Sequence, residues 1–99
     1  MSNTAKTSNP HDLASIHEII LVSLYTERYG TEIIQNIRRA SDYTRTISNS
    51  SLYPELKRLE QWGFVSSREG ELANRLYYVL TEKGREALDI KNKFLSKLR

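Results

Sequence analysis

The chain has no cysteine among its 99 residues. Neither a disulfide framework nor a thiolate metal site can therefore form. None of its apolar runs approaches the ~20 residues that a helix needs to span a bilayer. Residues 1–7 also lack the apolar core of a secretory signal. We therefore expect a soluble protein of the cytoplasm.

Motifs for catalysis are missing as well. The sequence has no nucleophile elbow, no glycine-rich phosphate loop and no metal-ligand spacing. His11 and His17 lie six positions apart, without a carboxylate or thiol pattern around them, so we expect neither a metal nor an acid–base role for them. One domain of this length also leaves little room for a deep pocket. We expect no enzyme and no cofactor.

The charge that is present is mildly positive, with a net charge of +3. Cations outnumber acidic residues five to three between Gln35 and Glu60, and six to two from Lys83 onward. Such an excess permits binding to nucleic acid without requiring it.

The first third of the chain predicts two helices. Residues 1–8 are small and polar, which is typical of a disordered arm. The first helix has two possible starts, at the Asn9-Pro10 pair or at a capping box that opens on Ser15, and is expected to run to Tyr29. Its apolar residues lie on more than one side, so the helix is expected to be buried on more than one side. Gly30 is expected to end it.

A second helix is predicted over residues 31–40. Its apolar positions are Ile33, Ile34 and Ile37, and two arginines complement the dipole at its C-terminal end. Residues 41–47 are expected to form a turn that leads to the next helix.

The third helix is predicted over residues 49–62, capped by Ser48. Its apolar face is formed by Leu52, Leu56 and Leu59, and its opposite face by Ser51, Glu55, Lys57 and Arg58. Pro54 interrupts the pattern, and an internal proline ordinarily costs ~3 kcal/mol. Either the regular helix starts nearer Ser51, or it bends where Pro54 meets Ser50.

The remainder predicts two strands and a last helix. Residues 64–69 and 75–80 are strand-like and flank a loop with Gly70 and Asn74, so they form a hairpin with an acidic tip. The last helix is expected from Thr81 to the end of the chain, with an apolar arc wider than a small domain can cover. A second subunit would cover that arc. The arc consists of Ala87, Leu88, Ile90, Phe94, Leu95 and Leu98.

Helices followed by a hairpin and a further helix form a winged helix-turn-helix, a mainly α fold with a small β-hairpin. With these motifs in view, the chain resembles the PadR family of bacterial transcriptional regulators over about residues 13–88. Three segments carry the resemblance: Gly30-Thr31-Glu32-Ile33, Ser50-Ser51-Leu52-Tyr53-Pro54-Glu55-Leu56-Lys57-Arg58-Leu59-Glu60 and Tyr77-Tyr78-Val79-Leu80-Thr81-Glu82-Lys83-Gly84.

The chain departs from the family pattern at three places. Thr31 replaces a frequent tyrosine, Ser50 replaces a frequent glycine, and Asn74-Arg75-Leu76 stands where relatives often have a more basic run. Because the last two could alter contacts to DNA, base preference is not carried over.

The resemblance implies a homodimer held by the first and last helices, which would bind a pseudo-palindromic operator as a repressor and be released by a small molecule or signal. We divide the chain into an arm (1–8), a winged-helix DNA-binding domain (9–80) and a dimerisation helix (81–99). The candidate interface residues are Ile16, Ile20, Leu88, Phe94, Leu95 and Leu98.

The candidate DNA-binding residues lie in the third helix, its cap and the base of the wing. For Tyr53 the alternative is a half-buried aromatic, for Lys57 and Arg58 a solvated helix face, and for Arg75 a cover over the sheet. Trp62 is expected in the core or at the dimer seam, and at least one of the adjacent tyrosines at 77 and 78 in the core. The candidate DNA-binding residues are Ser48, Asn49, Ser51, Tyr53, Lys57, Arg58 and Arg75.

A function of another class also fits this pattern. A winged helix that presents its faces to another protein, without binding DNA, would have the same fold, since fold alone does not fix function.

Overall fold

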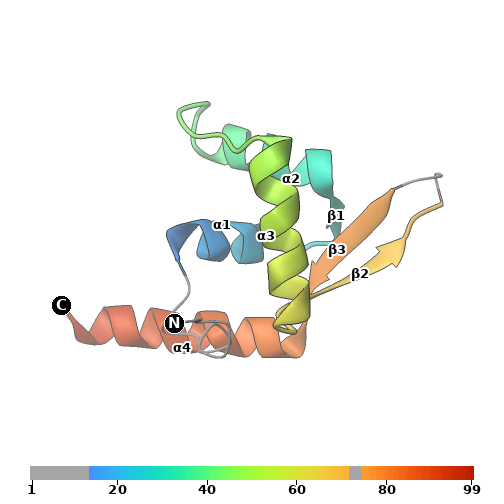
Figure 1. Ribbon diagram of the computed structural model, residues 1–99. Helices are drawn as coiled ribbons and strands as arrows, with labels where there is room; N and C mark the ends of the chain where they lie inside the picture. The colour runs from blue at the N-terminus through green and yellow to red at the C-terminus, as the bar shows by residue number, and fades with distance from the viewer. Residues whose placement is uncertain (1–13, 72–74) are drawn as a thin grey trace, which may run out of the picture.

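The computed structural model describes residues 14–71 and 75–99, and Figure 1 shows how its elements are arranged. The described residues form four helices and a small antiparallel sheet, in which β3 lies between β1 and β2. This confirms the predicted fold class, with one strand more than expected. The elements are α1 (Ser15–Ser23), β1 (Arg28–Tyr29), α2 (Gly30–Ala40), α3 (Asn49–Gln61), β2 (Val65–Glu69), β3 (Leu76–Leu80) and α4 (Glu82–Lys97).

The first helix is shorter than predicted. It ends at Ser23 rather than Tyr29, and the chain then turns into β1. Two contacts hold this end: the Arg28 Nε donates a hydrogen bond to the Ser23 carbonyl (2.8 Å), and the Leu80 amide donates one to the Leu24 carbonyl (2.9 Å). Because Leu80 lies far along the chain, the apolar period of the helix could not reveal where it stops.

The start of α1 also differs by one residue. Its N-cap is Ala14, whose amide donates to the Nδ1 of His17 (3.1 Å), so the predicted Ser15 cap is wrong. The alternative start at Asn9 and the arm at residues 1–8 lie outside the described residues.

Gly30 was expected to end the first helix, but it is the buried first residue of α2. The preceding Tyr29 is the N-cap, and its amide donates to the Glu32 Oε1 (3.0 Å). Ile33 and Ile37 are buried and Ile34 is half-buried, as their period predicted.

Helix α3 begins as predicted, because the Ser48 Oγ accepts a hydrogen bond from the Ser51 amide (3.2 Å). Pro54 lies in the second turn of this helix, so a start nearer Ser51 is wrong. Proline has no amide hydrogen for the Ser50 carbonyl four residues earlier. Both residues are exposed, so water can hydrate that carbonyl.

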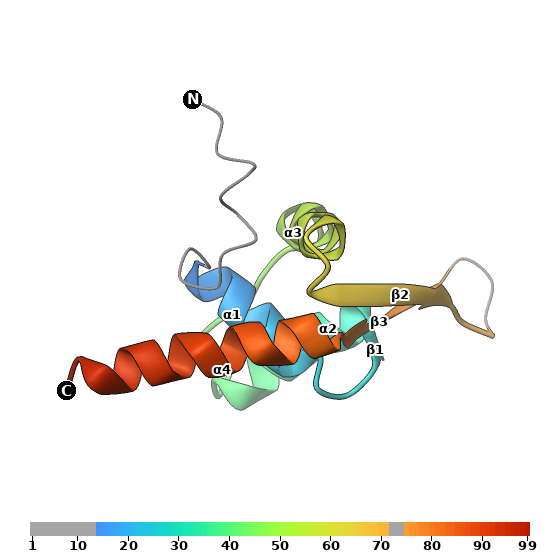
Figure 2. The same cartoon turned by 90° about the horizontal axis from the view of Figure 1, so that it is seen from below.

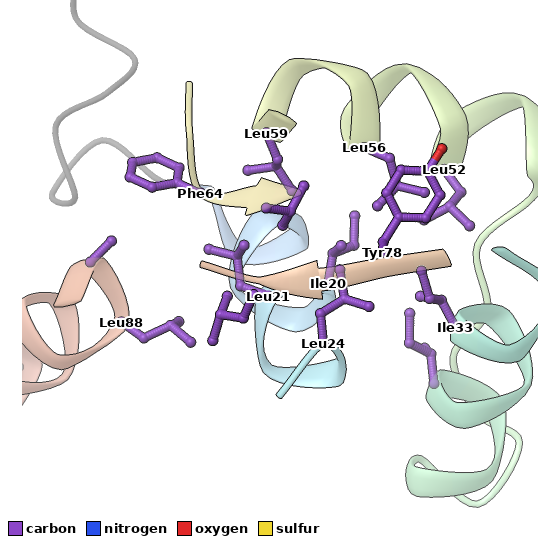
Figure 3. Close-up of a cluster of buried hydrophobic side chains, with 14 of the residues drawn as sticks. Ile20, Leu21, Leu24, Ile33, Leu52, Leu56, Leu59, Phe64, Tyr78 and Leu88 are labelled. Carbon is purple, nitrogen blue, oxygen red and sulfur yellow. The ribbon is translucent and has the colours of Figure 1, made fainter. Parts of the chain in front are cut away.

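The core lies between α3, the sheet and the first two helices (Figure 3). Leu52, Leu56 and Leu59 have no exposed surface, which confirms the predicted inner face of α3. Tyr78 is buried beside them, whereas Tyr77 lies on the other face of the sheet. Trp62 is half-buried at the edge of the core, with its ring against those of His17 and Phe64.

Helix α4 packs along the bottom of the molecule, and its C-terminal half extends beyond α1 (Figures 1 and 2). Figure 2 shows α3 nearly end-on, next to β2. The leucine face of this helix is buried in the core, and the residues opposite it are exposed. None of the helices in the described part has both the length and the apolar character needed to cross a membrane. The outer face of α3 and the neighbouring hairpin of β2 and β3, called the wing below, are thus open to solvent. The C-terminal half of α4 is open to solvent as well.

Candidate nucleic-acid interface

The three buried leucines of α3 fix which of its residues face outward. At about 100° per residue, the stripe opposite them is formed by Ser50, Pro54, Lys57 and Gln61. All four are exposed. Lys57 was among the predicted contacts, whereas Ser50, Pro54 and Gln61 were not. Measuring angles from the leucines, instead of choosing residues by charge and motif, would have found them from the sequence.

The N-terminus of α3 gathers several of the predicted residues. The Ser48 Oγ caps the helix and donates to the Ser51 Oγ (3.1 Å), and the Ser50 hydroxyl lies at 3.1 Å from it as well. Asn49 is exposed between them. The first turn of α3 contains no acidic residue, so nothing in it offsets the positive end of the helix dipole. An anion placed there would be stabilised.

Tyr53 and Arg75, predicted separately, line one cleft. Its volume is 320 Å³, and its walls also include Gly30 and Thr31 at the N-terminus of α2. The Arg75 guanidinium lies 4.1 Å from the centre of the Tyr29 ring, which holds it at the mouth of the cleft. A cation and a tyrosine hydroxyl therefore line one cleft beside the start of α2, and these two groups are suited to a phosphate. The Glu32 carboxylate caps that end of α2, so the helix dipole there is already partly offset.

Tyr78 forms another wall of this cleft. Burial raises the pKa of its hydroxyl, and the charges of Glu60 and Tyr53 raise it further. The hydroxyl therefore stays neutral at and well above neutral pH and adds no negative charge to the cleft.

Contacts on the outer face of the wing join it to the segment between α1 and α2. Arg68 in β2 forms two hydrogen bonds of 2.7 Å with the carboxylate of Glu27, and its guanidinium lies over the Tyr77 ring (5.0 Å). The Tyr77 ring packs edge-on against Tyr29. Hydrogen bonding from Arg68 holds the pKa of Glu27 below its ordinary value of 4.5. Glu69 and Glu71, the two carboxylates of the predicted acidic tip, are exposed. Asn74, which was predicted in the same loop, lies outside the described residues.

The far end of α3 is anchored by the segment that opens α4. The Lys83 Nζ donates to the Trp62 carbonyl at the end of α3 (2.8 Å), and the Thr81 hydroxyl donates to the Gly63 carbonyl (2.6 Å). The same hydroxyl accepts the Gly84 amide (3.0 Å) and so caps α4. Sequence reasoning identified this segment as a helix start but missed its role in orienting α3.

Arg58 is engaged within the chain. Its guanidinium forms hydrogen bonds of 3.0 Å with both oxygens of Glu55, and the Glu55 Oε1 also lies 2.8 Å from the Nε2 of His17. Both ring nitrogens of His17 therefore have protein partners.

The candidate interface residues divide into two groups. Phe94, Leu95 and Leu98 are 40%, 42% and 68% exposed, and Ile16 is half-buried. Ile20 and Leu88 belong to the core of the single chain and retain almost no exposed surface. Their assignment to a subunit interface is thus corrected, because side chains already buried in the single chain have no surface left for a partner.

Several solved structures have this fold. A transcriptional regulator from Clostridium thermocellum is 32% identical, with 84% of each chain covered and a TM-score of 0.75. The complex named hsRosR-S1, whose protein comes from H. salinarum, is 30% identical over 90% of this chain and 79% of that one, with a TM-score of 0.77. A PadR-like transcription factor from Bacteroides fragilis is 25% identical over 97% and 92%, with a TM-score of 0.76. No curated protein matches.

The model of the transcriptional regulator PadR-like family matches residues 19–90. The chain belongs to this family. It is therefore a transcriptional regulator and not an enzyme, as the sequence predicted.

The segments by which the sequence resembles PadR-like proteins meet in space. Tyr53, from the second segment, packs on Gly30, from the first. The third segment supplies Tyr78 to the cleft and Lys83 to the end of α3. In this PadR-like chain the motifs therefore set the position of α3 and the shape of the cleft beside it.

Proposed function

We propose that this chain is a sequence-specific DNA-binding regulator that acts in the cytoplasm as a homodimeric repressor. The observation that carries the proposal is the cleft formed by Tyr53, Arg75 and the N-terminus of α2. It lies directly beside the outward face of α3. A backbone phosphate in the cleft would leave that face toward the base edges of the adjoining major groove.

The outward face of α3 has the chemistry for this task. Lys57 offers a cation to the phosphates, and Ser50 and Gln61 on the same stripe offer polar groups to phosphate or base edges. Ser51 adds a hydroxyl on the flank of the helix start. Arg75 would hold the wing at the neighbouring backbone. Direct base readout is assigned to the first turn of α3, where Ser51 is exposed.

The homodimer is supported by the apolar stripe of α4. Phe94, Leu95 and Leu98 continue the stripe that Ala87 and Leu88 bury in the core, at a place where the helix has passed α1 (Figure 2). A second copy of the helix would bury these side chains, with Ile16 of α1 at the edge. Two recognition helices related by a two-fold axis would then read a pseudo-palindromic operator.

Repression follows from such a complex because a dimer that fills two major grooves excludes other proteins from the same DNA. Release by a small molecule or another signal is part of the proposal and rests on the family resemblance. The cytoplasmic location is included because transcription in bacteria takes place there.

The test measures binding to duplex DNA as a function of salt. We expect the logarithm of the binding constant to fall linearly with the logarithm of salt concentration. Lys57→Ala should weaken binding to all sequences alike and reduce the salt slope by about 0.9 for each chain bound. Arg85→Ala is the matched control, since Arg85 is an exposed cation on α4 whose guanidinium lies over the ring of Tyr25 (5.4 Å). It should leave the slope unchanged.

Sequence preference is tested at Ser51. Ser51→Ala keeps the backbone amide that Ser48 caps, so the helix start stays intact. Selection from a random DNA pool should then yield different preferred sequences for the variant and the wild type. Absence of duplex binding at low salt by the wild-type protein would refute the proposal and favour the protein-interaction module.

A further inference from the structure

Three side chains connect α1 to the charged residues of α3. His17 lies on α1, and Glu55 and Arg58 lie one turn apart on α3. The His17 Nε2 is 2.8 Å from the Glu55 Oε1, and the Arg58 Nη1 is 3.0 Å from each carboxylate oxygen. In the described part of the chain, no other side-chain hydrogen bond or ion pair joins α1 to the charged residues of α3.

The hydrogen bond at the other ring nitrogen fixes the tautomer of His17. The Ala14 amide donates to the Nδ1 (3.1 Å), so the Nδ1 of the neutral ring is the acceptor. The proton is then on the Nε2, which donates to Glu55. The Trp62 ring packs edge-on against the imidazole, with 5.5 Å between the centroids, and keeps it in this orientation.

Glu55 is therefore held more firmly than a carboxylate on a helix surface usually is. Exposed pairs three or four residues apart contribute little, because both side chains are mobile. Here His17 binds the carboxylate from the side of α1, and the Glu55 side chain is only 22% exposed. Arg58 accordingly meets an acceptor whose position is already set.

Arg58 is directed toward α1 although its Cα lies near the outward stripe. At 100° per residue it is about 40° from Pro54, on the flank opposite Tyr53. Its side chain is 51% exposed. A duplex docked on this face would therefore have phosphates within reach of the long Arg58 side chain, if Glu55 released it.

We propose that Glu55 is a positioning residue that holds Arg58 away from the DNA backbone, and that His17 makes this hold depend on the position of α1. Arg58 then contacts a phosphate only when the link opens. Because Ile16 on α1 borders the proposed subunit interface, a shift of α1 would change the affinity for DNA through Arg58. This inference rests on the proposed DNA-binding function and adds a regulatory contact to it.

The experiment is a double-mutant cycle, read as the salt dependence of duplex binding. Glu55→Gln should release Arg58, tighten binding at low salt and steepen the salt slope by about 0.9 for each chain bound, the value for one added phosphate contact. In an Arg58→Gln background, Glu55→Gln should leave the slope unchanged. That dependence separates release of Arg58 from simple removal of a negative charge.

Glu60→Gln is the matched control. Glu60 is an exposed carboxylate on the same helix, but its hydrogen bond goes to the Ser67 hydroxyl (2.7 Å) in β2 and not to Arg58. Its substitution removes the same charge and should leave the salt slope as in the wild type, with or without Arg58. Equal slopes for Glu55→Gln and Glu60→Gln would overturn the inference.

The part played by α1 is tested at His17. His17→Leu removes the donor to Glu55 and should steepen the slope only while Arg58 is present. His17→Gln, whose amide can donate to Glu55 again, should restore the wild-type slope. Thermal unfolding and circular dichroism show whether the His17 variants fold; Glu55→Gln, at a partly exposed site, tests the hold on Arg58 independently of them.

The outcomes separate this inference from the proposed function. Wild-type protein that binds duplex DNA while Glu55→Gln changes neither affinity nor slope refutes the hold on Arg58 and leaves the function standing. Wild-type protein that does not bind duplex DNA refutes both. An unchanged slope for His17→Leu, with Glu55→Gln behaving as expected, refutes the dependence on α1.

Discussion

The hydroxyl end of the Tyr53 ring lies against Gly30, in the space that a side chain on residue 30 would occupy. This contact joins the start of α2 to α3, and both residues line the cleft that Arg75 also lines. Glycine at position 30 is thus needed for a close approach. Its role here does not depend on an unusual backbone angle, since Gly63 is the only glycine with a positive φ among the described residues.

Gly30→Ala should displace Tyr53 and weaken DNA binding. The atoms in the way belong to the end of a side chain that is partly exposed, so we expect the free energy of unfolding to change by less than about 1 kcal/mol. In a Tyr53→Ala background, Gly30→Ala should have no further effect on DNA affinity. An equal loss of affinity in both backgrounds would show that Gly30 acts independently of Tyr53. Duplex titrations and denaturant unfolding measure the two quantities.

Gly84→Ala should destabilise the fold, although it lies within α4. Helix propensity alone favours alanine over glycine by about 1 kcal/mol. A methyl group at this position, however, would collide with the Phe64 carbonyl and with the Leu80 side chain. Because a backbone carbonyl cannot move aside, we expect an overpacking cost near the upper end of the usual range of about 1–3 kcal/mol. After the gain in helix propensity, the net loss of stability should be about 1–2 kcal/mol. A variant more stable than the wild type in denaturant unfolding would contradict the packing seen here.

The ion pair between Glu27 and Arg68 should make the wing sensitive to acid. Hydrogen bonding to Arg68 lowers the pKa of the Glu27 carboxyl in the folded state. The pair therefore stabilises the fold above the ordinary pKa of 4.5, and this contribution is lost as the pH falls through 4.5 toward the lower folded-state value. Glu27→Gln should show a smaller drop in melting temperature over that interval. A carboxyl resonance of Glu27 that titrates at or above 4.5 would disprove the lowered pKa.

Leu95→Glu combined with Leu98→Glu should yield a folded monomer. Both side chains are exposed in the single chain, so their substitution leaves the core intact while it places charge in the proposed interface. Asn92→Glu combined with Ser96→Glu is the control, since it adds the same charge outside the apolar stripe of the same helix. Light scattering should show a dimer for the wild type and the control only. A monomeric wild type would contradict the proposed homodimer and its two-fold arrangement on DNA.

Much of helix α3 could be predicted from its residues. The Ser48 cap and the inward leucines follow from local rules, namely a hydroxyl before a helix and an apolar period near 3.6. Strand β1 could not be predicted in this way. Arg28 and Tyr29 form it only because they pair with Tyr78 and Tyr77, which lie about fifty positions further along the chain.

The candidate site was predicted as separate residues. Tyr53 and Arg75 were named for their motif and charge, but their meeting in one cleft depends on how α2, α3 and β3 pack. Arg58 was predicted as a candidate DNA contact, with a solvated helix face as the alternative. Its guanidinium is instead bound to Glu55, which His17 on another helix also contacts. Such pairings are decided by which helices become neighbours.

The sequence by itself determined the secondary elements with strong periods, the cap at Ser48, the start of the last helix near Thr81 and the family of the chain, because these depend on residues close together. Tertiary structure alone decided that α1 stops at Ser23, that Tyr53 closes over Gly30, and that Ile20 and Leu88 are inside. Each of these depends on hydrogen bonds or burial between distant segments. Such contacts leave no period in the sequence, since their partners are brought together only by folding.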